Sequence, residues 1–157
     1  MAAAVGRELD RRRSFPITPS DIRRWALAIY HPEMPPRRFL VAEFSLTGEA
    51  PLAAPEDFNP FAWLVADPLG PPVALAEPED VLGIPGPGLR RRIRGGMEAN
   101  YGERMRSGDV IAAVRSLAGY DEREGRLGRM LLTTIEETWT NQRSERVKEY
   151  RFTFIRY

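Results

Sequence analysis

Cysteine is absent from this 157-residue sequence, and histidine occurs only once. The lack of cysteine excludes disulfide bonds, thiolate catalysis and cysteine-ligated metals. Because a structural zinc site needs several cysteine or histidine ligands, we expect no such site here. We also expect no cofactor.

Long apolar runs are missing as well. No stretch approaches the roughly 20 apolar residues that a membrane-spanning helix needs. Small apolar residues open the chain, but Arg7, Glu8 and Asp10 follow at once, so no hydrophobic region of signal-peptide length is present. We therefore expect a cytoplasmic protein with no membrane partner.

An excess of charge of one sign is the third feature that the sequence lacks. Its 23 basic and 22 acidic side chains nearly cancel, so overall electrostatics give no reason to expect a polyanionic partner. Nucleic-acid binding ranks last among the possible functions, because no aromatic-basic surface motif is present. The hydrophobic share of 43% and the charged share of 29% are ordinary for a globular protein. One folded domain over residues 1–157 is expected.

The first predicted helix begins at Thr18. Its hydroxyl can cap a free backbone N–H, Pro19 suits the first helical turn, and the acid of Asp21 suits the positive helix end. Prolines at positions 32, 35 and 36 then end the helix. The apolar residues that share one face of this helix are Ile22, Trp25, Ala26 and Ile29.

Proline punctuates the middle of the chain, at positions 51, 55, 60, 68, 71, 72, 78, 85 and 87. Such spacing allows only short elements, since proline interrupts both helices and central strands. The best of these is a short helical piece over residues 59–65, with Asn59 as its cap and Pro60 at its first position. It is apolar all round, which indicates burial.

After Gly88 the apolar residues follow a period of two. Residues 93–101 alternate as expected of a strand with one buried face. Further strands are predicted over residues 109–120, 128–140 and 146–157, with loops at 121–125 and 141–144. In the last strand Tyr150, Phe152 and Phe154 face the same way. The sequence thus predicts an α+β arrangement, a helix-rich first half followed by an antiparallel meander.

Several segments resemble, in order and spacing, the landmarks of MaoC-like N-terminal hydratase/dehydratase domains. They read DIRRWALAI over residues 21–29, APEDF over 54–58, GGMEANY over 95–101 and RSGDV over 106–110. The terminal strand pair is similar too, so the resemblance spans nearly the whole chain. It implies a hot-dog fold, a curved antiparallel sheet wrapped around a helix, paired with a second hot-dog domain.

The resemblance also implies an activity. Enzymes of this family add or remove water across the double bond of an acyl-CoA or acyl-carrier-protein thioester. The reaction expected is that of an (R)-specific enoyl-thioester hydratase or 3-hydroxyacyl-thioester dehydratase. It needs a general acid/base pair, together with N–H donors that stabilise charge on the thioester oxygen.

Active relatives carry the acid/base pair in an Asp-x-Asn-Pro-x-His-like segment after the first helix. The matching segment here is 28–36, in which His31 and Glu33 are the candidate catalytic residues. One interpretation is a rearranged pair. The other is a degenerate site, with His31 in a turn and Glu33 in solvent. Neither the order nor the spacing reproduces the active pattern, which favours degeneracy.

The first candidate substrate-binding group is the short piece capped by Asn59. The backbone N–H groups of Phe61 and Ala62 are candidate donors to a thioester oxygen. Core packing is the alternative role of the Phe61 side chain. Because prolines shorten this piece, the sequence favours an incomplete site.

The other candidate binding residues precede or lie within the first predicted strand. Gly95 and Gly96 would allow either the close approach of an acyl chain or a β-bulge. Arg90 and Arg92 belong to an arginine run over residues 90–94, which would either contact coenzyme A phosphates or form a solvated sheet edge.

The leading hypothesis is a substrate-binding subunit whose degenerate catalytic segment is completed by a homologous catalytic hot-dog subunit, in a heterodimer. An alternative is a non-catalytic homodimer that binds an acyl-CoA or another apolar ligand. A third is a small cyclase or isomerase of the cone-shaped class, because an early helix and a curved sheet also suit that fold.

Overall fold

The computed structural model describes residues 2–42, 44–45, 48–63, 77–126 and 128–157. Part of the predicted piece over 59–65 lies outside them. The elements are, in chain order, η1 (Ala2–Ala4), β1 (Glu8–Arg13), α1 (Pro19–Tyr30), η2 (Arg37–Phe39), β2 (Phe44–Ser45), β3 (Gly48–Glu49), η3 (Pro60–Ala62), α2 (Pro78–Leu82), β4 (Arg92–Tyr101), β5 (Ala112–Gly125), β6 (Gly128–Thr140) and β7 (Arg146–Arg156).

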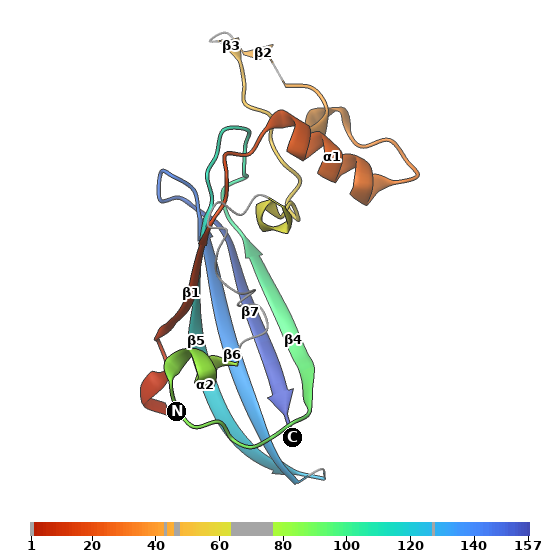
Figure 1. Ribbon diagram of the computed structural model, residues 1–157. Coiled ribbons are helices and arrows are strands. Elements are labelled where there is room, and N and C mark those ends of the chain that lie inside the picture. Colours follow the sequence, from red (N-terminus) through yellow and green to blue (C-terminus); the bar gives the residue numbers. More distant parts are fainter. Residues whose placement is uncertain (1, 43, 46–47, 64–76, 127) are drawn as a thin grey trace.

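The main sheet is antiparallel, with strand order β1-β5-β6-β7-β4. β5, β6 and β7 form a meander as predicted, but the predicted strand over 93–101, β4, pairs with β7 and not with β5. β1 and β4 are the two edges. The short helix α2 lies across one face of the curved sheet, whereas α1 lies beyond one end of it (Figure 1). The sheet therefore has two ends with different coverings, called below the α1 end and the α2 end.

One face of the sheet is buried, and it is called below the α2 face. Along β6 every second residue is buried, from Leu131 to Trp139, while the residues between are only partly covered. The register sets Phe154 of β7 beside Thr133 and Phe152 beside Ile135. The predicted alternation along the last strand is therefore confirmed.

The helix α1 begins as the sequence predicts. The Thr18 hydroxyl accepts a hydrogen bond from the Asp21 N–H (3.2 Å), and the Asp21 carboxylate accepts one from the Thr18 N–H (2.9 Å). These reciprocal bonds satisfy two donors that a helix start would leave free. Ile22 and Ala26 are buried, but Ile29 is exposed. The apolar stripe is thus covered only in its first turns.

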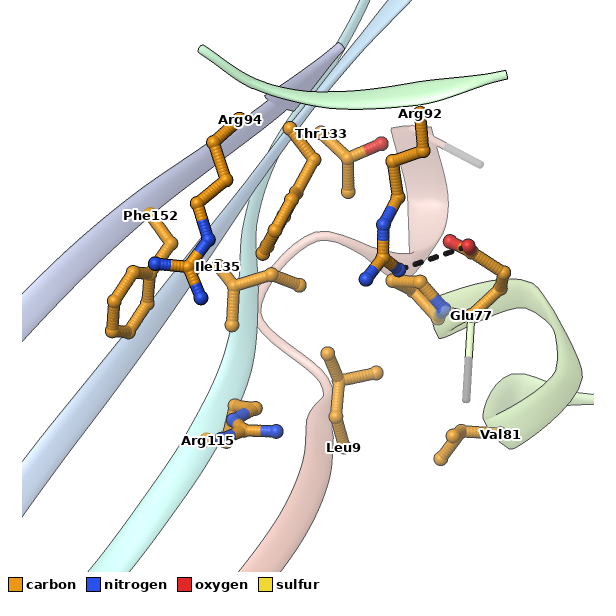
Figure 2. A pocket seen from close by; sticks show the side chains of 11 residues that line it. Leu9, Glu77, Val81, Arg92, Arg94, Arg115, Thr133, Ile135 and Phe152 are labelled. Atoms are coloured by element: carbon orange, nitrogen blue, oxygen red, sulfur yellow. Dashed lines mark hydrogen bonds and ion pairs between the residues drawn. The ribbon is translucent and has the colours of Figure 1, made fainter. Parts of the chain in front are cut away.

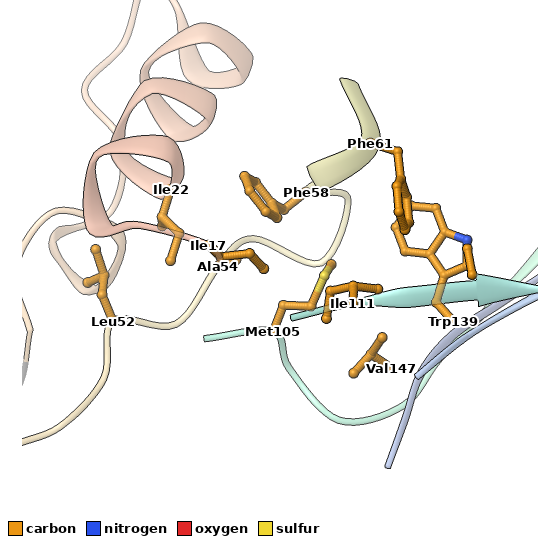
Figure 3. Close-up of a cluster of buried hydrophobic side chains, with 11 residues drawn as sticks. Ile17, Ile22, Leu52, Ala54, Phe58, Phe61, Met105, Ile111, Trp139 and Val147 are labelled. Carbon is orange, nitrogen blue, oxygen red and sulfur yellow. The ribbon is translucent and has the colours of Figure 1, made fainter. Parts of the chain in front are cut away.

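The largest hydrophobic core lies at the α1 end (Figure 3). Phe58 is fully buried there, and the ring of Phe61 packs edge-on against Trp139 with centroids 5.0 Å apart. Ala54 and Phe58, from the family-like segment 54–58, are core residues. The other members of the cluster are Ile17, Ile22, Leu52, Met105, Ile111, Ala113 and Val147.

The predicted strand over residues 93–101 is present as β4, but its predicted burial is wrong. Ile93, Met97 and Tyr101 are each about half exposed, at 49%, 58% and 50%. The reason is position, because β4 is the last strand of the sheet. An edge strand shows its outer backbone and much of its side-chain surface to solvent.

A β-bulge at Gly95 changes the facing of β4. The register passes from Arg94 beside Phe154 to Gly96 beside Thr153, so one residue of β4 has no partner. A bulge reverses the alternation of side chains along a strand. Arg94 consequently shares the α2 face with residues beyond the bulge, and Ile93 points the other way.

Two further expectations need correction. The predicted loop at 121–125 is strand, because β5 continues to Gly125 in a long hairpin with β6. Strand β1 was not predicted, since its sequence ELDRRR has no apolar alternation. It is held by pairing with β5.

Candidate functional site

A cavity of about 160 Å³ lies between α2 and the sheet, and it is called below the α2 pocket. Figure 2 shows side chains from β1, α2, β4 and the meander converging on it. Its apolar lining comprises Leu9, Pro78, Val81, Ile135, Phe152 and Phe154. Its polar lining comprises Glu77, Arg92, Arg94, Arg115 and Thr133.

Two of the three arginines in the α2 pocket are tied to carboxylates. Arg92 donates to Glu77 (Nη1 to Oε1, 3.0 Å), and its guanidinium lies over the ring of Phe154. Arg115 donates twice to one oxygen of the buried Glu137, at 3.0 and 2.8 Å. Their charges are therefore compensated within this chain.

A buried network anchors α2 to the sheet beside the pocket. Glu79 accepts hydrogen bonds from the Arg156 guanidinium and from the Tyr120 hydroxyl (3.0 Å). Arg156 also donates to the Thr133 hydroxyl at 3.2 Å. Since Glu79 and Arg156 are only 1% and 4% exposed, each charge needs the other.

The protonation states in this network follow from its contacts. Burial by itself would raise the pKa of Glu79, but hydrogen bonds from Arg156 and Tyr120 outweigh it and the pKa is lowered. Burial and the neighbouring Glu79 raise the pKa of Tyr120 to about 12. At neutral pH the network thus holds an ionised acid and a protonated phenol, which suits anchoring and not proton abstraction.

A second hollow, of about 390 Å³, lies where the C-terminal turn of α1 meets segment 55–57 and the end of β4. It is called below the α1 groove. Its carboxylates are Glu56 and Asp57, and Arg104 lies 3.5 Å from Glu56. The other lining residues are Ile29, Tyr30, Arg38, Phe39, Pro55 and Tyr101. Sequence reasoning singled out segment 54–58 but not its two acids.

Lys148 lies buried near the α1 groove. Its ammonium donates to the Phe58 carbonyl at 3.0 Å and lies 5.1 to 5.6 Å from the ring centroids of Trp139, Tyr101 and Tyr150. Burial lowers the pKa of Lys148 to about 8, against the opposing effect of Asp57 and Glu56. Sequence reasoning missed this residue, because it is one charge within a strand otherwise read for its apolar face.

The predicted catalytic residues lie outside both hollows. His31 and Glu33 follow the end of α1, and both are exposed. The groove is lined by their neighbour Tyr30 but by neither of them. The backbone N–H of Glu33 donates to the Tyr30 carbonyl, which closes a turn.

The predicted donors at the start of η3 are already in use. Asn59 caps this short helix as predicted, and its Oδ1 accepts from the Phe61 N–H at 3.0 Å. The Ala62 N–H donates to the Asn59 carbonyl at 3.2 Å. Neither N–H points freely to a ligand, and the Phe61 ring belongs to the core.

The remaining predicted binding residues lie on or next to the edge strand β4, in different surroundings. Gly95 and Gly96 lie at the bulge of the exposed edge strand β4. Arg90 is exposed just before that strand, whereas Arg92 lines the α2 pocket. Of the predicted site residues, Arg92 therefore lines the α2 pocket, and none is among the described lining of the α1 groove.

None of the helices in the described residues is long and apolar enough to cross a membrane. Within the same residues, no three histidine, aspartate or glutamate side chains come together as metal ligands.

A family model described as "FAS1-like, dehydratase domain region" matches residues 3–150. No curated protein matches the sequence significantly.

Solved structures show the same fold. The chain is similar to one in the ChsH1-ChsH2 complex from Mycobacterium tuberculosis, with a TM-score of 0.65, 15% identity, and coverage of 96% of this chain and 84% of that one. It is also similar to a MaoC-like dehydratase from Rhodospirillum rubrum, with a TM-score of 0.55 and 21% identity. That match covers 98% of this chain and 92% of the dehydratase. A third similar structure is the HadBC (3R-hydroxyacyl-ACP dehydratase) complex from Mycobacterium tuberculosis, with a TM-score of 0.55 and 18% identity. The match covers 95% of this chain and 96% of that one. The predicted hot-dog fold is confirmed.

Proposed function

The chain belongs to the family of FAS1-like dehydratase domain regions, and we propose that it is the substrate-binding subunit of an acyl-thioester hydratase or dehydratase. A homologous hot-dog subunit supplies the acid/base pair. Support comes from the family match and from the likeness to two complexes, ChsH1-ChsH2 and HadBC, the second named as a dehydratase. The expected product of hydration is the (R)-3-hydroxyacyl thioester.

The observation that carries this proposal is the position of His31 and Glu33. A general acid or base must come within about 3 Å of the proton that it transfers. These two side chains are exposed and line neither hollow. Glu56 and Asp57 do line the α1 groove, but both are exposed and lack the dry surroundings that tune a catalytic carboxyl.

The edge strand β4 is the surface that we assign to the partner. Its outer edge is unpaired within the described residues, and Met97 and Tyr101 are exposed along it. Exposed edge strands invite pairing with another strand.

A non-catalytic homodimer that binds an acyl-CoA is the second candidate. It is favoured by the α2 pocket, a largely apolar cavity that also carries three arginines. Such a pocket would bind a ligand without a heterologous partner.

Co-expression with a homologous hot-dog protein encoded nearby tests the proposal. Mass measurement should show a complex of the two chains, and only the complex should hydrate an enoyl-CoA. The double variant His31→Ala, Glu33→Gln should leave that rate unchanged, while Met97→Lys should weaken the complex. Arg123→Glu, on the exposed far end of β5, is the control for a change of charge away from β4.

Three results separate the alternatives. Turnover by this chain alone, lost in the double variant, would contradict the degenerate-site proposal. A self-associated chain that binds acyl-CoA and retains no homologue would support the homodimer. Loss of the complex in Arg123→Glu as much as in Met97→Lys would contradict the assignment of β4.

A further inference from the structure

One positive charge of the α2 pocket has no carboxylate partner among the residues that the structure describes. Arg92 is bonded to Glu77, and Arg115 to Glu137. Arg94 lines the same cavity with an exposed side chain, and within the described residues no ion pair joins its guanidinium to a carboxylate.

The described acids around the pocket are already paired with other arginines. Glu79 is taken by Arg156, which also lies 3.3 Å from Glu77. Glu137 is shared by Arg115 and Arg12, and it also accepts from the Trp139 indole N–H. Among the described residues, the uncompensated positive charge of the pocket is therefore that of Arg94.

A β-bulge places Arg94 on the face of the sheet that lines the pocket. Because the bulge at Gly95 reverses the alternation of β4, Arg94 stands on the same face as Phe152 and Ile135 (Figure 2). Glycine suits this point, since a Cβ on Gly95 would lie 3.0 Å from the Ile155 side chain, which would then have to shift slightly. Arg94 therefore lines the same pocket as the apolar side chains of Phe152 and Ile135.

The ligand that matches this arrangement is a carboxylate on a short hydrocarbon stem. The planar guanidinium fork fits a carboxylate with two parallel hydrogen bonds, and the apolar lining fits the stem. The size is limited, because a cavity of about 150 Å³ is known to hold benzene, and this one is about 160 Å³. Roughly six carbon atoms therefore fit, whereas the nucleotide of coenzyme A does not.

We propose that the α2 pocket binds the acyl part of a thioester whose far end carries a carboxylate, about six carbons long, with Arg94 as the carboxylate partner. This inference rests on the proposed function for its thioester half. The pocket itself can be tested without it.

The first test uses free hexanoate and its neutral analogue hexanamide on the purified chain, with binding followed by NMR titration. Hexanoate should bind at least tenfold more tightly than hexanamide. Arg94→Ala should remove that preference, and Arg94→Lys should keep part of it. Arg151→Ala is the matched control, because Arg151 pairs with Glu136 on the other face of the sheet. An unchanged amide spectrum outside the pocket shows that each variant is folded.

The second test compares adipyl-CoA with hexanoyl-CoA on the complex of the two subunits. Adipyl-CoA should bind at least tenfold more tightly, and Arg94→Ala should make the two equal. Equal binding to the unaltered protein, with enoyl-CoA hydration intact, would overturn the carboxylate inference alone. Arg94-dependent hexanoate binding in a complex that hydrates no enoyl thioester would overturn the proposed function alone. Failure of hexanoate to bind at all overturns the assignment of the pocket.

Discussion

The two ends of the sheet are held together by different interactions. At the α1 end, aromatic and aliphatic side chains from α1, segment 52–58 and the meander form one apolar cluster. At the α2 end, a smaller cluster around Leu117 and Ile135 is joined by buried ion pairs. The family-like segments 21–29 and 54–58 contribute to the first end, so much of the resemblance is carried by residues that pack. The charged pocket lies at the other end.

The largest effect should come from the apolar end. Phe58→Ala removes a fully buried ring that packs against Trp25 and Trp63, with centroids 5.6 and 6.4 Å away. Such a truncation leaves a cavity and should lower the free energy of unfolding by about 4 kcal/mol. Urea unfolding measures it. Met34→Ala, at a 75% exposed position, should change stability by less than about 0.5 kcal/mol. Similar losses in the two variants would contradict the described core.

The charged end should respond to loss of one partner. Glu79→Ala leaves the buried Arg156 without its main counter-ion, and breaking such a pair typically costs 3–5 kcal/mol. We expect about 3 kcal/mol, at the lower end of that range, because Arg156 keeps Glu77 and Thr133 as partners.

The control for this change is Glu77→Ala, at the less buried carboxylate. Its loss should cost no more than about 1 kcal/mol, as for exposed pairs. If the two variants unfold at the same urea concentration, the buried network does not fasten α2. The contrast between the two ends would then rest on apolar packing alone.

Local signals explain what the sequence could predict. The cap of α1 needs only Thr18 and Asp21, which are three residues apart, and the meander follows from alternation within each strand. The Arg156–Glu79 pair joins residues 77 positions apart. No spacing rule connects residues so far apart, so the α2 network cannot be predicted from the sequence.

The candidate site shows the same limit. A family pattern falls on the segment that contains His31 and Glu33, which makes them candidate catalytic residues. Such a pattern does not say whether a side chain reaches a cavity. Arg94 was part of a recognised arginine run, but its facing depends on the bulge at Gly95. A one-residue shift moves a side chain to the other face of a sheet, and this shift brings Arg94, which remains exposed, to the lining of the α2 pocket.

The smallest of the three expected effects on stability comes from a buried charge within the apolar α1 end. Lys148, the only lysine of the sequence, is buried there with a pKa lowered to about 8. Its unfolded pKa is near 10.5, so between these values the unfolded chain binds more protons than the folded one. Stability contributed by this group must then rise with pH across that window. From pH 7 to 10 the gain should be about 2 kcal/mol.

Urea unfolding of the unaltered protein and of Lys148→Met, at several pH values from 7 to 10, isolates this gain. The difference between their free energies of unfolding should move in favour of the unaltered protein as the pH rises. Tyr150 lies in the same cluster, but burial raises its pKa to about 12, so it stays protonated across the range. Because no second lysine titrates there, a difference that stays constant would mean that the ammonium is hydrated. The α1 end would then be less dry than its apolar packing implies.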